Sequence, residues 1–140
     1  MMGFGGKVDK ASNQVISGEG WPDLTNDEFR QLRRIPHTFD NDSIAVAITI
    51  AANNIQEKLV SLLVEGMPPS LSVAKTALYK RAVYGRAHSE LLPEFATQDR
   101  RKEGDNAALD EPQQAARFLA QSNKDVSQLL GRSANGIGVI

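Results

Sequence analysis

The sequence predicts an all-α fold, a small bundle of about four helices with extended N- and C-terminal arms. Apolar residues recur at steps of three and four along several segments, which is typical of amphipathic helices. Eight of the 11 glycines lie in the first 20 or the last ten residues. We therefore expect a flexible N-terminal arm over residues 1–20, a helical body over 21–131 and a C-terminal tail over 132–140.

The first helix is predicted by a capping box. Thr25 and Glu28 have the spacing at which each side chain can bond to the other residue's backbone N–H. Leu24 and Phe29 occupy the two positions of a hydrophobic staple around this start. Pro36 should end the helix near Arg34 or Ile35, because the proline ring disfavours the α conformation for the residue before it.

A second helix is predicted from Ser43 to Glu65, followed by Gly66 as the residue that stops it. Its buried stripe consists of apolar residues at helical spacing: Ile44, Ile48, Ala51, Ile55, Leu59 and Leu62. Residues 44–50 also alternate like a strand, but the continuing stripe favours a helix. Val46 and Ile50 point away from the stripe. They indicate either a central core helix or a face that meets another subunit.

A third helix is predicted from Ser70 or Ser72 to Leu92, with Pro93 ending or kinking it. Its stripe comprises Leu71, Ala74, Leu78, Ala82 and Gly85. Gly85 inside a helix suggests close approach of a neighbouring helix. The polar residues 96–109 are expected to form an exposed loop.

The last helix should open at Asp110 or Glu111, with Pro112 in its first turn, and stop at Gly131. Its stripe comprises Ala115, Phe118, Leu119, Ser122, Val126 and Leu129.

The composition limits the classes of protein to which the chain can belong. A chain of 140 residues suffices for one domain, and a net charge of −1 gives no global attraction to nucleic acid. The absence of cysteine excludes disulfides, thiol nucleophiles and cysteine-ligated metals. No apolar run has the length of a secretory signal or of the ~20 residues that span a membrane. We expect a protein of the cytoplasm, or of a particle assembled there.

Catalytic and cofactor motifs are missing from the sequence. His37 and His88 stand outside any metal-binding spacing, no phosphate-binding glycine loop is present, and Asp40 and Asp42 fit helix caps better than a calcium loop. We expect no enzyme activity, no metal and no cofactor. The basic run Arg100, Arg101 and Lys102 is either a solvated or ion-paired surface or a contact with DNA.

The order of these features resembles a known family. Trp21-Pro22-Asp23-Leu24 heads a short helix, and a central helix carries the sequence YKRAVYGRA at 79–87. The basic run at 100–102, a final helix and an apolar C-terminus follow. This order resembles the head completion proteins (GPL family) of peduovirus-type contractile-tailed phages.

The resemblance implies a structural adaptor that forms a ring beneath the portal, closes the DNA-filled head and offers a docking surface to the tail. Its partners would be the portal protein, neighbouring copies in a dodecamer, and a tail-terminator or neck protein, with non-specific contact to packaged DNA. The protein would assemble in the host cytoplasm and reside in the head–tail neck of the virion. The C-terminal segment would dock on the portal.

The tail sequence fits such docking. The side chains of Ile137, Val139 and Ile140 are separated by Gly136 and Gly138, a pattern suited to pairing with an exposed edge or filling a groove. A disordered terminus is the alternative. Two other functions stay open: a small helical nucleic-acid-binding regulator that uses the third helix and residues 100–102, and a hydrolase that uses His37 or His88, which no other residues support.

Overall fold

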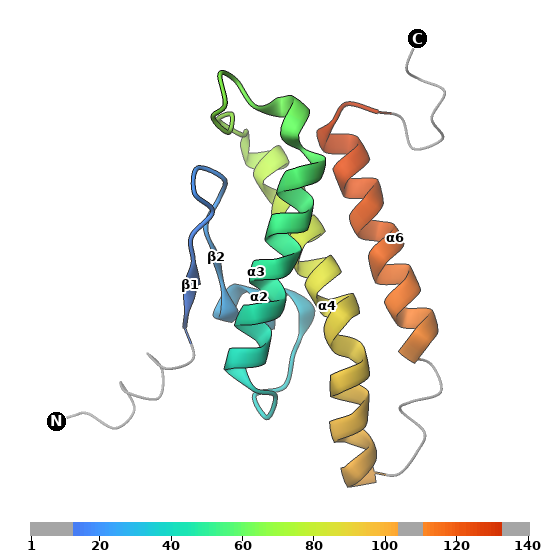
Figure 1. The fold of residues 1–140 in the computed structure, drawn as a ribbon. Coiled ribbons are helices and arrows are strands. Elements are labelled where there is room, and N and C mark those ends of the chain that lie inside the picture. Colours follow the sequence, from blue (N-terminus) through green and yellow to red (C-terminus); the bar gives the residue numbers. More distant parts are fainter. Residues whose placement is uncertain (1–12, 104–110, 133–140) are drawn as a thin grey trace, which may run out of the picture.

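The computed structural model describes residues 13–103 and 111–132. Its elements are β1 (Val15–Ile16), β2 (Leu24–Thr25), α2 (Asn26–Arg33), α3 (Asn41–Lys58), a short 3-10 turn (Val60–Leu62), α4 (Val73–Glu103) and α6 (Glu111–Leu129). Figure 1 shows α4 at the centre, with α6 running antiparallel along one side and α3 and α2 along the other. The fold is mostly α-helical, as predicted, with four helices in the described residues.

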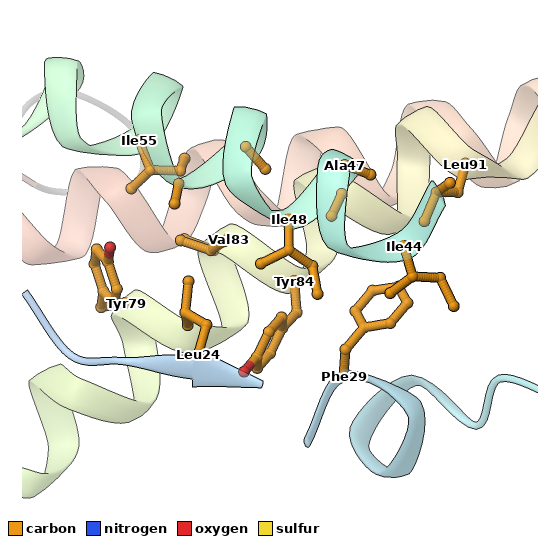
Figure 2. Close-up of a cluster of buried hydrophobic side chains, with 14 of the residues drawn as sticks. Leu24, Phe29, Ile44, Ala47, Ile48, Ile55, Tyr79, Val83, Tyr84 and Leu91 are labelled. Atoms are coloured by element: carbon orange, nitrogen blue, oxygen red, sulfur yellow. The ribbon is translucent and has the colours of Figure 1, made fainter. Parts of the chain in front are cut away.

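The core lies where α2 and α3 meet α4 (Figure 2). The predicted stripe of α3 faces it: Ile44, Ile48, Ala51, Ile55 and Leu59 are all buried. Aromatic rings fill the rest, with Trp21 stacked on Tyr79 at 5.5 Å between ring centroids. Phe29 packs edge-on against Tyr84. The expectation that residues 44–50 are helical rather than extended is therefore confirmed.

The connection from α2 to α3 is organised by a buried arginine. Arg30 donates hydrogen bonds to the carbonyl oxygens of Pro36 (2.7 Å) and Phe39 (2.6 Å) and to Oδ1 of Asn41 (2.6 Å). Burial lowers the pKa of this guanidinium, while the charges of Asp27 and Asp40 act in the opposite direction. Since one side chain satisfies several loop carbonyls, it fixes the turn that aims α3 back across α4.

Both N-terminal caps occur where the sequence predicts them. The Thr25 hydroxyl accepts from the backbone N–H of Glu28 at 2.9 Å, and Asp40 accepts from that of Ser43 at 2.8 Å. The helix that Thr25 caps ends at Arg33, just before Pro36, as predicted. Asp40 is thus a cap, as expected, whereas Asp42 lies in the first turn of α3 and is not the cap that the sequence suggested.

A short antiparallel pair of strands corrects the expectation of a strand-free body. Val15 pairs with Thr25 and Ile16 with Leu24. The amide of Asn26 also donates to the carbonyl of Gln14 at 3.0 Å. Residues 14–16, which the sequence assigned to the N-terminal arm, are therefore hydrogen-bonded to β2 and to the first residue of α2. Residues 1–12 of that arm lie outside the described residues.

The predicted end of the second helix is wrong by about two turns. The helix α3 stops at Lys58, and Val64 and Met67 then exchange two backbone hydrogen bonds of 2.8 and 2.9 Å across Glu65 and Gly66. Both of these residues have positive φ, 52° and 79°, as a tight two-residue turn requires. Gly66 therefore serves a turn, and not the helix cap that the sequence suggested.

The predicted loop at 96–109 is wrong over its first half, because α4 continues through Pro93 to Glu103. A proline inside a helix costs about 3 kcal/mol, since one backbone bond is lost. Packing after the proline offsets this cost: Phe95 and Ala96 are buried, and the Phe95 ring stacks on Phe39 at 4.0 Å. The contact joins residues far apart in sequence, which local rules do not anticipate.

Candidate interaction surfaces

The two histidines have different surroundings, and neither belongs to a metal cluster within the described part of the chain. His37 is exposed. His88 lies among Phe29, Phe95 and Phe118, and its Nδ1 accepts a 3.0 Å hydrogen bond from Nε of Arg33. Burial, reinforced by the charge of Arg33, lowers the pKa of His88 to about 4. The neutral imidazole thus joins α2, α4 and α6 as part of the structure.

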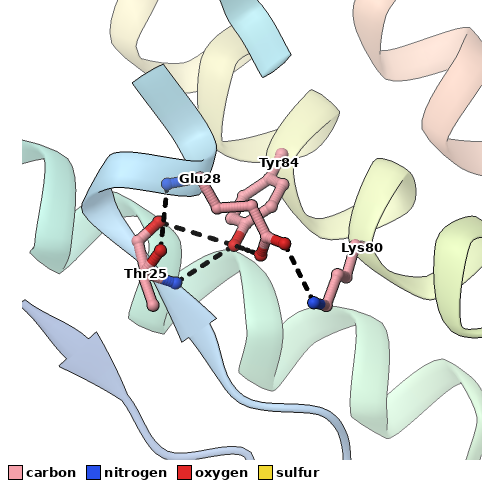
Figure 3. A network of polar contacts seen from close by, with 4 residues as sticks. All are labelled: Thr25, Glu28, Lys80 and Tyr84. Atoms are coloured by element: carbon pink, nitrogen blue, oxygen red, sulfur yellow. Dashed lines mark hydrogen bonds and ion pairs between the residues drawn. The ribbon is translucent and has the colours of Figure 1, made fainter. Parts of the chain in front are cut away.

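A polar network connects the start of α2 to α4 (Figure 3). The sequence predicts that Glu28 bonds to the backbone N–H of Thr25, but that N–H donates instead to the Tyr84 hydroxyl at 3.1 Å. Tyr84 donates to Glu28 at 2.6 Å, and Lys80 binds the other carboxylate oxygen at 3.0 Å. Burial, with the carboxylate beside it, raises the pKa of Tyr84 far above its usual value.

A second polar network connects α4 to α6. Asp125 is fully buried and receives two hydrogen bonds from Arg81, of 2.8 and 3.0 Å. Gln121 adds a third at 3.1 Å. The buried Ser122 hydroxyl donates to the carbonyl of Ala82 at 2.7 Å. These contacts fix the position of α6 along α4.

The C-terminal end of α6 is held by a complete helix-stop motif. Gly131 has a φ of 78°, and the amides of Gly131 and Arg132 donate to the carbonyls of Gln128 (3.0 Å) and Ser127 (2.8 Å). This is the pattern of a Schellman cap, so the predicted stop at Gly131 is confirmed. The chain beyond Arg132 therefore leaves from a fixed point on the bundle.

Two grooves flank α4, and each has an apolar floor with a rim of one predominant charge. The first, which we call the acidic groove, has a volume of about 420 Å³; its lining includes Val46, Ile50, Asp42, Glu90 and Glu94. Val46 and Ile50 are 58% and 50% exposed, so the face that the sequence singled out is not buried within the chain.

The second groove, which we call the basic groove, lies between α2 and α4 and has a volume of about 390 Å³. Leu32 and Ala77 supply apolar surface, and Arg33, Lys80 and Arg81 line it together with Glu28. Leu32 is 61% exposed. The sequence does not single out Leu32, because one outward apolar residue on a short helix carries no periodic signal.

The structure describes the other predicted site residues only in part. Arg100, Arg101 and Lys102 lie on the last turns of α4 rather than in a loop, and their side chains are outside the description. The tail residues Ile137, Gly138, Val139 and Ile140 also lie outside the described residues.

One end of the bundle, between α3 and α4, carries a further set of exposed apolar residues that the sequence did not single out: Val60, Val64, Met67 and Val73. Among the described residues, no helix combines the length and apolar character that crossing a membrane requires.

The described residues thus form a small helical bundle that carries two grooves with apolar floors and charged rims. The sequence profile of the phage head completion protein (GPL) family matches residues 70–140, which comprise α4, α6 and the tail. The chain belongs to this family, as its feature order suggested.

A protein described as a probable head completion/stabilization protein of Haemophilus phage HP1 (strain HP1c1) is 26% identical over 151 aligned residues. The alignment covers 98% of this chain and 99% of the relative, so the likeness also includes the part that precedes α4. No solved structure matches the chain. The protein is thus a structural component of a phage head, which implies contacts with other head or tail proteins.

Proposed function

We propose that this protein forms a ring beneath the portal of a tailed phage, closes the DNA-filled head and presents a docking surface to the tail. The observation that carries the proposal is the family match over α4, α6 and the tail, together with the full-length likeness to a head completion protein. In this role the bundle needs binding surfaces and no cofactor or catalytic site.

The C-terminal tail is the proposed contact with the portal. The capped end of α6 gives the tail a fixed origin at Arg132, and eight residues in extended form reach about 28 Å from it. Ile137, Val139 and Ile140 would supply apolar anchors, while Gly136 and Gly138 let the backbone approach its partner closely.

A ring explains how weak individual contacts can hold the protein on the portal. Each copy would hold the portal through one short tail, and neighbouring copies would raise its effective concentration. Val46 and Ile50 are the proposed subunit contact, because both are large, apolar and at least half exposed on one helix face. We propose a dodecamer, located in the virion neck after assembly in the host cytoplasm. The tail-terminator or neck protein would bind the opposite side.

Removal of residues 133–140 tests the tail. This deletion keeps Arg132, whose amide completes the cap of α6, so the bundle should keep its helix content by circular dichroism. We expect the protein retained on purified DNA-filled heads to fall at least tenfold. Replacement of Ile137, Val139 and Ile140 by serine should do the same, whereas Ser133→Ala with Asn135→Ala should not. Full retention of the deleted protein would refute docking through the tail.

Contact of Arg100, Arg101 and Lys102 with packaged DNA is a secondary part of the proposal. These residues end the longest helix and are the densest basic run in the chain. The alternative, an independent DNA-binding regulator, has less support because the net charge is −1. Salt-dependent binding of the isolated protein to duplex DNA would favour that alternative.

A further inference from the structure

We propose that the acidic groove of one copy docks on the basic groove of the next copy, so that copies associate head to tail. This inference rests on the proposed ring and adds the surface that receives Val46 and Ile50. The rims are complementary: Asp42, Glu90 and Glu94 on one side, and Arg33, Lys80 and Arg81 on the other. The occupant of each groove is therefore a second copy of this chain.

The rims keep opposite net charge after internal pairing is considered. In the basic groove, Glu28 and the buried Asp125 pair with Lys80 and Arg81, which leaves the charge of Arg33 in excess. In the acidic groove, Arg86 lies 3.7 Å from Glu90, which leaves Asp42 and Glu94 in excess. Charges of this kind orient two surfaces and speed their encounter.

The apolar floors provide the surface that association would bury. Leu32 is 61% exposed in the basic groove, and Val46 and Ile50 are 58% and 50% exposed in the acidic groove. Burying such side chains drives association, whereas rim charges mainly fix its direction.

The positions of the grooves suit a ring. The acidic groove lies between α3 and α4, with Glu90 and Glu94, and the basic groove lies between α2 and α4, with Lys80 and Arg81, so the two are separate surfaces. A closed ring of many copies needs two different contact faces on each copy, because head-to-tail contacts form a ring when the rotation between copies closes. A twofold dimer would instead place like faces together.

Engineered cysteines test this pairing in assembled particles, since the chain has no cysteine of its own. The test chain carries Leu32→Cys and Ile50→Cys, which are exposed positions in the two grooves. After mild oxidation or treatment with a short bis-maleimide, we expect a ladder of covalent dimers, trimers and larger species on denaturing gels. Each single-cysteine chain should stay monomeric, because position 50 meets position 32 and not itself.

The matched control pairs Leu32→Cys with Glu57→Cys, which is an exposed position on α3, like Ile50, but lines neither groove. An equal ladder from the control, or dimers from a single-cysteine chain, would overturn the head-to-tail contact. So would the absence of any ladder from particles that contain the test chain. If particles lack the unsubstituted protein as well, the proposed function fails with the contact.

Charge reversal gives an independent measurement. Glu94→Lys should reduce incorporation into particles at least threefold, because it brings a cation to the basic groove of the neighbour. Glu57→Lys makes the same charge change at an exposed site on α3 outside the grooves and should incorporate normally. Equal incorporation of both variants would count against the proposed contact.

Discussion

The two sides of α4 are built differently. Toward α2 and α3, large apolar side chains such as Phe29 and Ile48 fill the interface, and the ion pair there, Lys80–Glu28, is partly exposed. Toward α6, small residues such as Ala82 and Gly85 face the neighbour, and a buried charge and a buried hydroxyl hold it. Displacing α6 along α4 would leave the buried carboxylate of Asp125 without its cation, which is costly in the interior. Polar contacts therefore fix the position of α6 along α4, and this position also determines where the tail begins.

The largest effect on stability is expected from removing one partner of the Arg81–Asp125 ion pair, and the two partners should differ. Arg81→Ala leaves the carboxylate of Asp125 buried without its cation, which should lower the free energy of unfolding by about 3–5 kcal/mol. Asp125→Ala should cost less, because the Arg81 side chain is 54% exposed and can turn to water. Urea denaturation followed by circular dichroism measures both.

The double variant Arg81→Ala with Asp125→Ala is the control for this asymmetry. It should be more stable than Arg81→Ala alone, because no unpaired charge remains in the interior. Equal losses of unfolding free energy in the two single variants would mean that Asp125 is hydrated in solution. The two sides of α4 would then differ less than the structure indicates.

The pH dependence of stability probes His88, the residue of α4 that contacts both α2 and α6. His88 contacts Phe29 of α2 and Phe118 of α6, and its pKa of about 4 lies below the ordinary 6.5. Between these values the unfolded chain binds a proton that the folded chain does not. Stability should therefore fall as pH drops from about 6.5 to about 4, by about 3 kcal/mol in total for this group.

His88→Asn separates this contribution from that of the carboxylates. Asparagine keeps an acceptor for Arg33 but does not titrate, so the slope of stability between pH 6.5 and 5 should be lost. His37→Gln, at an exposed position, should keep the slope. An unchanged slope in the His88 variant would show that the imidazole is accessible to protons in the folded state.

The sequence predicted the features that depend on near neighbours. Thr25, Asp40 and Gly131 cap helices through bonds to residues within five positions, so local patterns identify them. Val46 and Ile50 were found because α3 is apolar beyond its buried stripe. These signals need no knowledge of which helix packs on which.

The features that the sequence did not predict depend on distant partners. Tyr84 replaces Glu28 as the partner of the Thr25 amide from 59 positions away, and Arg81 finds Asp125 across 44 positions. Helix continuation through Pro93 depends on Phe39 in another segment. The basic groove likewise combines residues of α2 and α4. Single-sequence patterns specify helices and their ends, but not which side chains meet across them.

The smallest expected effect has the opposite sign and tests how closely α6 approaches α4. The sequence suggested that Gly85 makes room for a neighbouring helix, and α6 does lie against it. A Cβ added there would stand 3.7 Å from the Phe118 carbonyl oxygen and 3.8 Å from the nearest Arg33 nitrogen, both ordinary contacts. Gly85→Ala should therefore raise the free energy of unfolding by about 0.5–1 kcal/mol, the helix propensity difference between the two residues.

Gly85→Leu is the comparison that defines the limit of this space. Its longer side chain would press on the Phe118 backbone and the Arg33 guanidinium, so it should destabilise the protein by about 1–3 kcal/mol. A loss of stability in Gly85→Ala itself would mean that the helices approach more closely than 3.7 Å allows. In that case small residues, as well as the Arg81–Asp125 pair, would fix the position of α6 and the origin of the tail.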